Sequence, residues 1–371
     1  MMSLIVKSNN GRFELIDCDE RLYDLCQELY STKRFALDTE FVRTNTFYGQ
    51  LGLIQLCAAQ TCYLIDPIKI NAWDTFCEIF CESNRKVILH SASEDLNLLY
   101  TSLNISLSDL FDSQVAGAFL GLGFSLSYQA IVQLILGQHI KKDVTRSNWL
   151  ARPLSERQLR YAVDDVYYLP ALEESLREQL ILENKIDWFE NECLSLLENS
   201  RSVEDPASWE SSYSQISGSW KLEIENLECL QQLCFWRETQ ARQRNKPKSW
   251  IAKDSDLLKM SLFIGDSNSI SIKKLMAETN IDKQFLENEG EEVIEKLSNS
   301  RDRLKPIEKE LLNYPLSSSA RKILKLCQER VAKVAERLSI SPELLARKRM
   351  LQKLVKDYEY SGSVIWPKEF Y

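Results

Sequence analysis

The stretch from Arg34 to Phe41 constrains this chain most, because two acids follow an apolar run at alternate positions. The run before the acids is typical of a buried strand. Side chains two residues apart on a strand point to the same face, so Asp38 and Glu40 are predicted to lie side by side. Two neighbouring anions are tolerated best with a cation between them, which makes a divalent metal ion the expectation. For an isolated D-x-E pattern, however, two solvated residues at a strand end are the commoner interpretation.

The length and composition favour a soluble protein of several domains. The chain has 371 residues, 44% of them hydrophobic, so two or three domains are expected. No apolar run approaches the ~20 residues that span a bilayer, and the N-terminus lacks signal-peptide features. We therefore expect a cytoplasmic protein without a membrane partner, and ten scattered cysteines fit free thiols in a reducing compartment. The net charge of −8 argues against bulk attraction of nucleic acid but leaves room for local basic patches.

The apolar pattern predicts a mixed sheet flanked by helices. Three strand-like runs cover residues 35–41, 51–58 and 62–66, and the short break at 59–61 indicates a hairpin turn between antiparallel strands. A buried strand at 87–89 and a helix at 94–103 follow, and residues 112–197 are predicted to be all helix. Strands that are first antiparallel and then alternate with helices indicate an α/β domain.

The second half of the chain is predicted to be helical. Residues 199–218 are rich in Ser, Glu and Asp and are expected to form a linker. Beyond it, the segment 250–257 can be aligned with 344–351, each after a basic helix and a proline. Two small helical domains in tandem would explain this repeat, and coincidence among Leu-rich helices is an equal alternative.

Two other segments carry acids in suggestive positions. Glu94 and Asp95 follow the strand at 87–89 and open a helix, where acids in the first turn are also favoured by the helix dipole. Tyr161 and Asp165 are four residues apart in a predicted helix and therefore share one face. The alternative there is a half-buried tyrosine beside a surface acid.

Taken together, these segments resemble a known family. The motifs LDTEFVRTNTFYGQLGLIQL (37–56), LHSASEDL (89–96) and RSNWLARPLSERQLRYAVDDVYYL (146–169) occur in order and look like ribonuclease D, an exonuclease group with four acids and a tyrosine. The resemblance implies a ribonuclease H-like mixed-sheet exonuclease domain at 1–198, the linker at 199–218, and two small all-α HRDC-like domains at 219–300 and 301–371.

The resemblance also implies which residues form the site. Asp38 and Glu40 match the acids of the first motif, Asp95 that of the second, and Tyr161 and Asp165 those of the third. The four acids are expected to hold two divalent ions, Mg²⁺ or Mn²⁺, with Asp38 bridging both. Glu40 and Asp165 would help to hold the ion that activates water, and Asp95 would support the other. Tyr161 would orient the attacking water rather than act as a base.

The function implied is that of a metal-dependent 3′ to 5′ exoribonuclease, which trims RNA ends and releases nucleoside 5′-monophosphates. The expected substrates are tRNA precursors. A DNA exonuclease is the rival within the same chemistry, because the motifs do not obviously require a 2′-hydroxyl. An RNA-binding scaffold without catalysis is the rival from another class, and the presence of all four acids and the tyrosine argues against it. No sequence feature predicts an oligomeric state.

Three further residues are candidate substrate contacts. Phe41 could stack against the terminal base, Gln55 could reach a base or ribose, and His90 could contact sugar or phosphate. For each the alternative is a packed core residue, and for His90 a packed, hydrogen-bonded histidine is at least as probable. The basic residues Lys141, Lys142 and Arg146 could meet the RNA backbone or form a solvated face.

Basic residues around Trp250 predict a second RNA surface in the helical region. They are Arg237, Arg242, Arg244, Lys246, Lys248 and Lys253, and Arg347, Lys348 and Arg349 recur in the second copy of the repeat. If Trp250 is a core residue, as its repeat partner Leu344 indicates, only the charges remain available for RNA.

Overall fold

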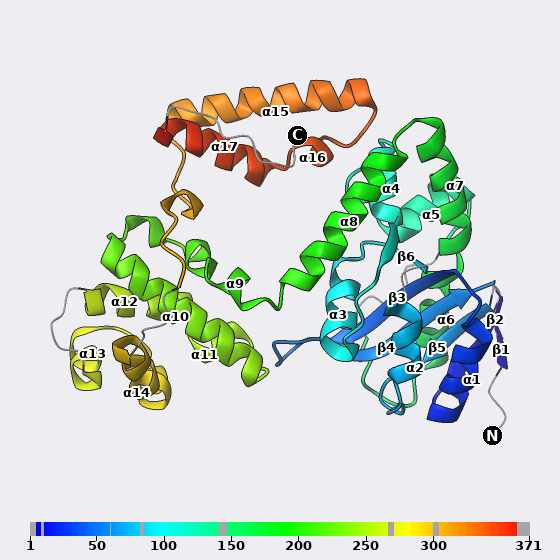
Figure 1. Ribbon diagram of the computed structural model, residues 1–371, viewed down its shortest axis with the longest axis horizontal. Coiled ribbons are helices and arrows are strands. Elements are labelled where there is room, and N and C mark those ends of the chain that lie inside the picture. The colour runs from blue at the N-terminus through cyan, green and yellow to red at the C-terminus, as the bar shows by residue number, and fades with distance from the viewer. Residues whose placement is uncertain are drawn as a thin grey trace. The chain divides into compact units, whose positions relative to one another are not determined.

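The computed structural model describes residues 5–8, 11–59, 61–81, 85–140, 147–265, 271–299 and 304–361. The chain divides into two compact units. Unit 1 comprises Met1–Arg43, Gly49–Val203 and Cys327–Lys348, and unit 2 comprises Thr44–Tyr48, Glu204–Leu326 and Arg349–Tyr371. Figure 1 shows the strands of unit 1 with helices around them, and unit 2 as helices.

Unit 1 is built on a seven-stranded sheet with the order β1-β2-β5-β4-β3-β6-β7. The strands are β1 (Ile5–Ser8), β2 (Gly11–Ile16), β3 (Arg34–Val42), β4 (Gln50–Ala58), β5 (Thr61–Ile65), β6 (Lys86–Leu89) and β7 (Asp109–Asp112). β4 runs antiparallel to both β3 and β5, whereas β6 pairs in parallel with β3 and β7. The predicted mixed sheet and its hairpin are confirmed.

Eight helices of the described chain belong to the part of unit 1 that precedes residue 204. They are α1 (Asp19–Leu29), α2 (Asp74–Cys81), α3 (Ser93–Leu103), α4 (Ser113–Phe119), α5 (Tyr128–Leu136), α6 (Glu156–Tyr167), α7 (Leu169–Leu182) and α8 (Ile186–Ser202). The prediction of helix throughout 112–197 is confirmed for α4 to α8 but is wrong for the described loops at 120–127, 137–140 and 147–155, and for Asp112, which ends β7. Four residues with only two apolar ones carry no readable period, so the pattern does not reveal β7.

Helix α6 forms where its sequence predicts it. Ser155 and Gln158 make a reciprocal capping box at its start. Its buried residues Ala162, Val163 and Val166 share one side, and the helix contacts β3, β4 and β5. This packing brings the side of α6 that carries Tyr161 and Asp165 toward the acids of β3.

The remaining helices lie beyond residue 203. They are α9 (Pro206–Trp209), α10 (Ile224–Gln243), α11 (Lys248–Ile251), α12 (Asp254–Gly265), α13 (Ile272–Glu278), α14 (Lys283–Asn299), α15 (Ser318–Leu338), α16 (Pro342–Leu345) and α17 (Lys348–Ser361). Residues 199–218, predicted as a linker, include the end of α8, the short helix α9 and a 3₁₀ turn (Ser212–Gln215). Tyr213 and Ile216 are buried in the core of unit 2.

The order long helix, four-residue helix, helix occurs twice. α10, α11 and α12 have 20, 4 and 12 residues, and α15, α16 and α17 have 21, 4 and 14. All ten cysteines are free thiols. Across the described ranges, no helix combines the length and the apolar character that a membrane span requires.

Candidate active site

Three acids from two elements meet at the sheet. Asp38 and Glu40 project from β3, and Asp165 comes from α6. One carboxylate oxygen from each lies within 4.8 Å of the other two. The strand period and the four-residue helix spacing therefore bring these acids together as predicted. The ladder between β3 and β4 shifts its register directly after Glu40, so the strand becomes irregular where the acids end.

Asp95 approaches from α3 and is almost fully buried. Its carboxylate accepts a hydrogen bond from the hydroxyl of Thr39, the residue between the two acids of β3. Asp95 is not one of the three closely grouped carboxylates, yet its negative charge raises the pKa of both Asp38 and Glu40. It thus lies beside the group rather than within it.

The turn that carries Asp95 is held by a residue that sequence reasoning missed. The buried carboxylate of Asp112 accepts hydrogen bonds from the backbone N–H groups of Ser91 (3.0 Å) and Ala92 (2.8 Å). It also caps α4 through Gln114 N–H (2.8 Å). Ser91 has a φ of 63°, an unusual conformation for serine that these bonds help to hold. An Asp before a helix signals a cap, but nothing local links Asp112 to a turn about 20 residues earlier.

Burial and mutual repulsion raise the pKa values of the acids. Burial is the main cause at Asp38, whose pKa lies well above its usual range, with repulsion from Asp95, Asp165 and Glu40 adding to it. The pKa of Glu40 rises to about 8, through burial and then the charges of Asp165 and Asp95.

The other two acids are shifted less. Burial raises the pKa of Asp95 to about 7, and the hydrogen bond from Thr39 opposes it. Burial likewise raises the pKa of Asp165 to about 7, opposed by the nearby hydroxyl of Tyr161. None of the four acids forms an ion pair with another described residue. The site therefore gathers negative charge without a protein cation to balance it.

This donor set fits a hard divalent cation. Oxygen-only ligands from carboxylates are those that Mg²⁺ and Mn²⁺ prefer. Gln55 adds a second indication, because it lies opposite Asp38 on β4 and is fully buried. Neither its amide oxygen nor its amide nitrogen has a hydrogen-bond partner within the described chain. A buried amide without hydrogen-bond partners is energetically unfavourable, unless a water molecule or a ligand group beside Asp38 supplies the missing hydrogen bonds.

Tyr161 lies next to the acids in protonated form. Its hydroxyl interacts with the carboxylate of Asp165 and opposes the rise in the pKa of that acid. Burial raises the pKa of the phenol, and the charges of Asp165, Glu40 and Asp38 raise it further. A phenol in this setting is a hydrogen-bond donor at neutral pH rather than a base.

The candidate substrate contacts differ in accessibility. Phe41 is partly exposed, with the Arg43 guanidinium 5.8 Å from its ring centroid. Both ring nitrogens of His90 are engaged, Nδ1 at 2.9 Å from Ser113 Oγ and Nε2 at 3.1 Å from the carbonyl oxygen of Leu126. These two contacts favour the alternative that His90 is a packed, hydrogen-bonded residue rather than a substrate contact. The full burial of Gln55 limits how far its amide could reach toward a substrate. The assignment of all three as substrate contacts stays a prediction, and Lys141, Lys142 and Arg146 lie outside the described residues.

Comparison with known proteins identifies both parts of the chain. The family model described as 3′-5′ exonuclease matches residues 13–181, and the HRDC domain model matches residues 226–297. The chain is 32% identical to a ribonuclease D of Pseudomonas paraeruginosa over 338 residues, which cover 91% of this chain and 88% of the relative. It is 32% identical to ribonuclease D of Haemophilus influenzae over 358 residues, covering 94% and 86%.

A solved structure agrees with these matches. The crystal structure of Escherichia coli RNase D, described as an exoribonuclease involved in structured RNA processing, superposes with a TM-score of 0.80 at 27% identity. The match covers 97% of this chain and 94% of that one. The acids that gather on β3 and α6 therefore sit in a mixed-sheet exonuclease domain that is followed by an HRDC domain. The chain belongs to the ribonuclease D family, and its enzymatic class is that of the 3′–5′ exoribonucleases.

Proposed function

We propose that this enzyme trims the 3′ ends of tRNA precursors and releases nucleoside 5′-monophosphates, with two divalent ions, Mg²⁺ or Mn²⁺, at the site. The observation that carries the proposal is the group formed by Asp38, Glu40 and Asp165, whose charge no described cation balances. Two divalent ions, when bound, supply activation of the attacking water and neutralisation of charge on the phosphate and the leaving 3′ oxygen.

The residues of the chain have separate roles in this proposal. Asp38, Glu40 and Asp165 would hold the ions with their closely spaced oxygens, Asp38 serving both, and Asp95 would add support. The hydroxyl of Thr39 keeps the carboxylate of Asp95 turned toward β3. The Tyr161 hydroxyl donates a hydrogen bond that orients the attacking water, and Phe41 stacks against the terminal base.

The choice of RNA rests on the relatives, which are named ribonuclease D, and on the structured-RNA processing described for the E. coli enzyme. The choice of tRNA precursors rests on the family resemblance of the motifs. The repeated helix order from α15 to α17 supports a second HRDC-like domain at 301–371, after the first at 219–300. A cytoplasmic location and the domain boundary near residue 198 belong to the same proposal.

The test is digestion of a 5′-labelled tRNA precursor that carries a 3′ trailer, beside a DNA oligonucleotide of matched sequence. We expect stepwise shortening of the RNA, release of nucleoside 5′-monophosphates, and complete arrest by chelator. Faster loss of the DNA would overturn the choice of substrate. Shortening that continues in chelator would overturn the metal-dependent mechanism.

A further inference from the structure

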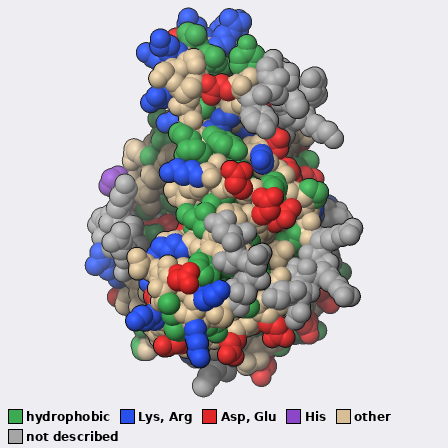
Figure 2. Space-filling model, turned by 90° about the vertical axis from the view of Figure 1, so that its left-hand side faces the viewer, with side chains coloured by type: hydrophobic (Ala, Val, Ile, Leu, Met, Phe, Trp, Pro, Cys, Tyr) green, Lys and Arg blue, Asp and Glu red, His purple; other side chains and the backbone are tan. Residues whose placement is uncertain are grey.

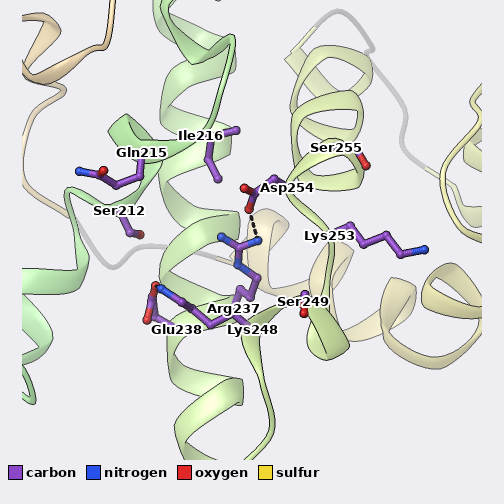
Figure 3. A pocket seen from close by; sticks show the side chains of 10 residues that line it. All are labelled: Ser212, Gln215, Ile216, Arg237, Glu238, Lys248, Ser249, Lys253, Asp254 and Ser255. Carbon is purple, nitrogen blue, oxygen red and sulfur yellow. Dashed lines mark hydrogen bonds and ion pairs between the residues drawn. The ribbon is translucent and has the colours of Figure 1, made fainter. Parts of the chain in front are cut away.

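The basic residues predicted to bind RNA near Trp250 are mostly engaged inside unit 2. The ion pairs are Arg237–Asp254 (2.6 Å), Arg242–Glu238 (2.6 Å), Arg244–Glu289 (2.5 Å), Lys248–Glu238 (2.8 Å) and Lys253–Asp282 (2.9 Å). Figure 3 shows Arg237 directed at Asp254 within a pocket that Lys248 and Glu238 also line. Trp250 is 60% exposed rather than a core residue, and the ammonium group of Lys246 lies 5.7 Å from its ring centroid. The basic cluster around Trp250 therefore offers little free positive charge.

Helix α15 shows the opposite arrangement. Its buried residues Ala320, Leu324 and Ala335 lie on one half of the helix. The other half carries exposed basic side chains at Arg321, Lys322, Lys325, Arg330, Lys333 and Arg337. Two acids, Glu329 and Glu336, lie among them. Within the described ranges, none of these six basic side chains forms an ion pair.

The positive charge continues beyond α15. Residues 318–361 hold eleven lysines and arginines against five acids, in a chain whose net charge is −8. In α17 the pKa of Lys356 is lowered, mainly by burial and further by repulsion from Arg349. Figure 2 shows Lys and Arg side chains gathered over this region at the top of the view. Like charges of this density repel one another and are stabilised when an anionic partner binds.

We propose that the solvent-facing side of α15 binds the phosphate backbone of the RNA substrate. From Arg321 to Arg337 the helix rises about 24 Å, enough to follow several successive phosphates. A charge run on a helix is often only a solvated face, and such faces usually pair their charges with acids one turn away. On α15, Glu329 and Glu336 leave the cations unpaired, so the counter-charge is expected from outside the protein. The inference rests on the proposed RNA substrate.

The test compares two triple variants with the same change in net charge. The first replaces three lysines of α15 (Lys322→Gln, Lys325→Gln, Lys333→Gln). The control replaces three exposed lysines of the HRDC domain that have no ion pair in the described chain (Lys273→Gln, Lys283→Gln, Lys296→Gln). The probe is a fluorescein-labelled RNA hairpin with a single-stranded 3′ tail, and its Kd is measured by anisotropy in chelator, at salt between about 50 and 200 mM.

We expect the α15 variant to bind about tenfold more weakly and to lower the salt slope of log K by roughly 2, whereas the control changes Kd less than about twofold. The matching Lys→Arg triple on α15 should retain wild-type affinity, because it keeps the charges. Equal losses in both Gln triples would show a bulk charge effect and overturn the proposal, as would unchanged binding by the α15 variant. A wild-type protein that neither binds nor shortens RNA would instead overturn the proposed function itself.

Discussion

The exonuclease site and the HRDC domain differ in how their charges are balanced. At the site, the half-buried acids Asp38, Glu40 and Asp165 converge without a described cation beside them. In the HRDC domain, buried charges have partners, as for Glu238, which is 5% exposed and binds both Arg242 and Lys248. Burial would raise the pKa of Glu238, but the hydrogen bonds from these two cations bring it below its usual value.

This difference in charge pairing distinguishes charged residues that stabilise the fold from charged residues that are available to bind a ligand. A buried charge is tolerated when the protein supplies its partner, and it is costly when the protein does not. Unpaired acids at the site and unpaired cations on α15 are therefore functional candidates, whereas the paired residues around Arg242 are structural. Stacking of the Arg242 guanidinium at 3.8 Å from the Trp209 ring centroid and 4.5 Å from that of Phe47 agrees with a structural role.

The largest expected effect comes from removing one of the unpaired acids. Asp38→Asn should reduce nucleotide release at least about a thousandfold, or about 4 kcal/mol in activation free energy, because the proposed metal site would lose its central carboxylate. RNA binding should persist, measured as the Kd for labelled RNA. The control is Asp164→Asn, which removes the same charge beside Asp165. A variant Asp38→Asn that releases nucleotides at the normal rate would refute the assignment.

A smaller loss of catalytic rate is expected when the phenol hydroxyl beside the acids is removed. Tyr161→Phe should lower kcat roughly a hundredfold, about 2.7 kcal/mol, with KM nearly unchanged, since the ring still packs but the hydroxyl no longer orients the water. Single-turnover rates, measured from low to saturating enzyme concentration, separate the change in the maximal rate from the change in KM. A rise in KM with unchanged kcat would mean that Tyr161 binds substrate instead.

The site was largely predictable because its residues obey local periods. Asp38 and Glu40 are two apart on a strand, and Tyr161 and Asp165 are four apart on a helix, so each pair shares a face before any tertiary structure is known. The mixed sheet follows from apolar runs for the same reason. The role of Thr39 was not predictable in this way. The alternation of side chains along a strand does not reveal that its hydroxyl donates a hydrogen bond to Asp95, which lies on α3.

What was not predictable depends on partners that are distant in sequence. Gln55 is a polar residue within a predicted strand and could reach a substrate, yet β4 lies between β3 and β5 and buries it completely. The cations around Trp250 form a basic cluster in the sequence, but their acids come from other segments, such as Asp282 for Lys253. Charge pairing across a core leaves no local spacing to detect.

The paired region should respond in stability rather than in activity. Glu238→Gln removes the charge that two cations share, and we expect a loss of about 2 kcal/mol in the free energy of unfolding, measured in denaturant. RNA affinity should remain within about twofold of wild type. Glu228→Gln, at an exposed position of the same helix, is the matched control and should change little. If Glu238→Gln strongly altered RNA binding while leaving stability intact, the structural interpretation of this cluster would be wrong.

The smallest effect concerns protons at the unpaired acids. An acid whose pKa is raised by folding favours the native state at low pH and loses that contribution as pH rises from its unfolded value, about 4.3 for glutamate, through the folded one. In the folded protein the pKa of Glu40 is about 8, and the pKa values of Asp95 and Asp165 are about 7. The metal-free protein should therefore lose stability between about pH 6 and pH 8.5, and its Tm should fall by roughly 3 °C. Added Mn²⁺ should raise Tm more at the higher pH, because fewer protons then compete for the carboxylates. Glu40→Gln should flatten the metal-free pH dependence, and an unchanged slope in that variant would show that the acids of the site do not carry it.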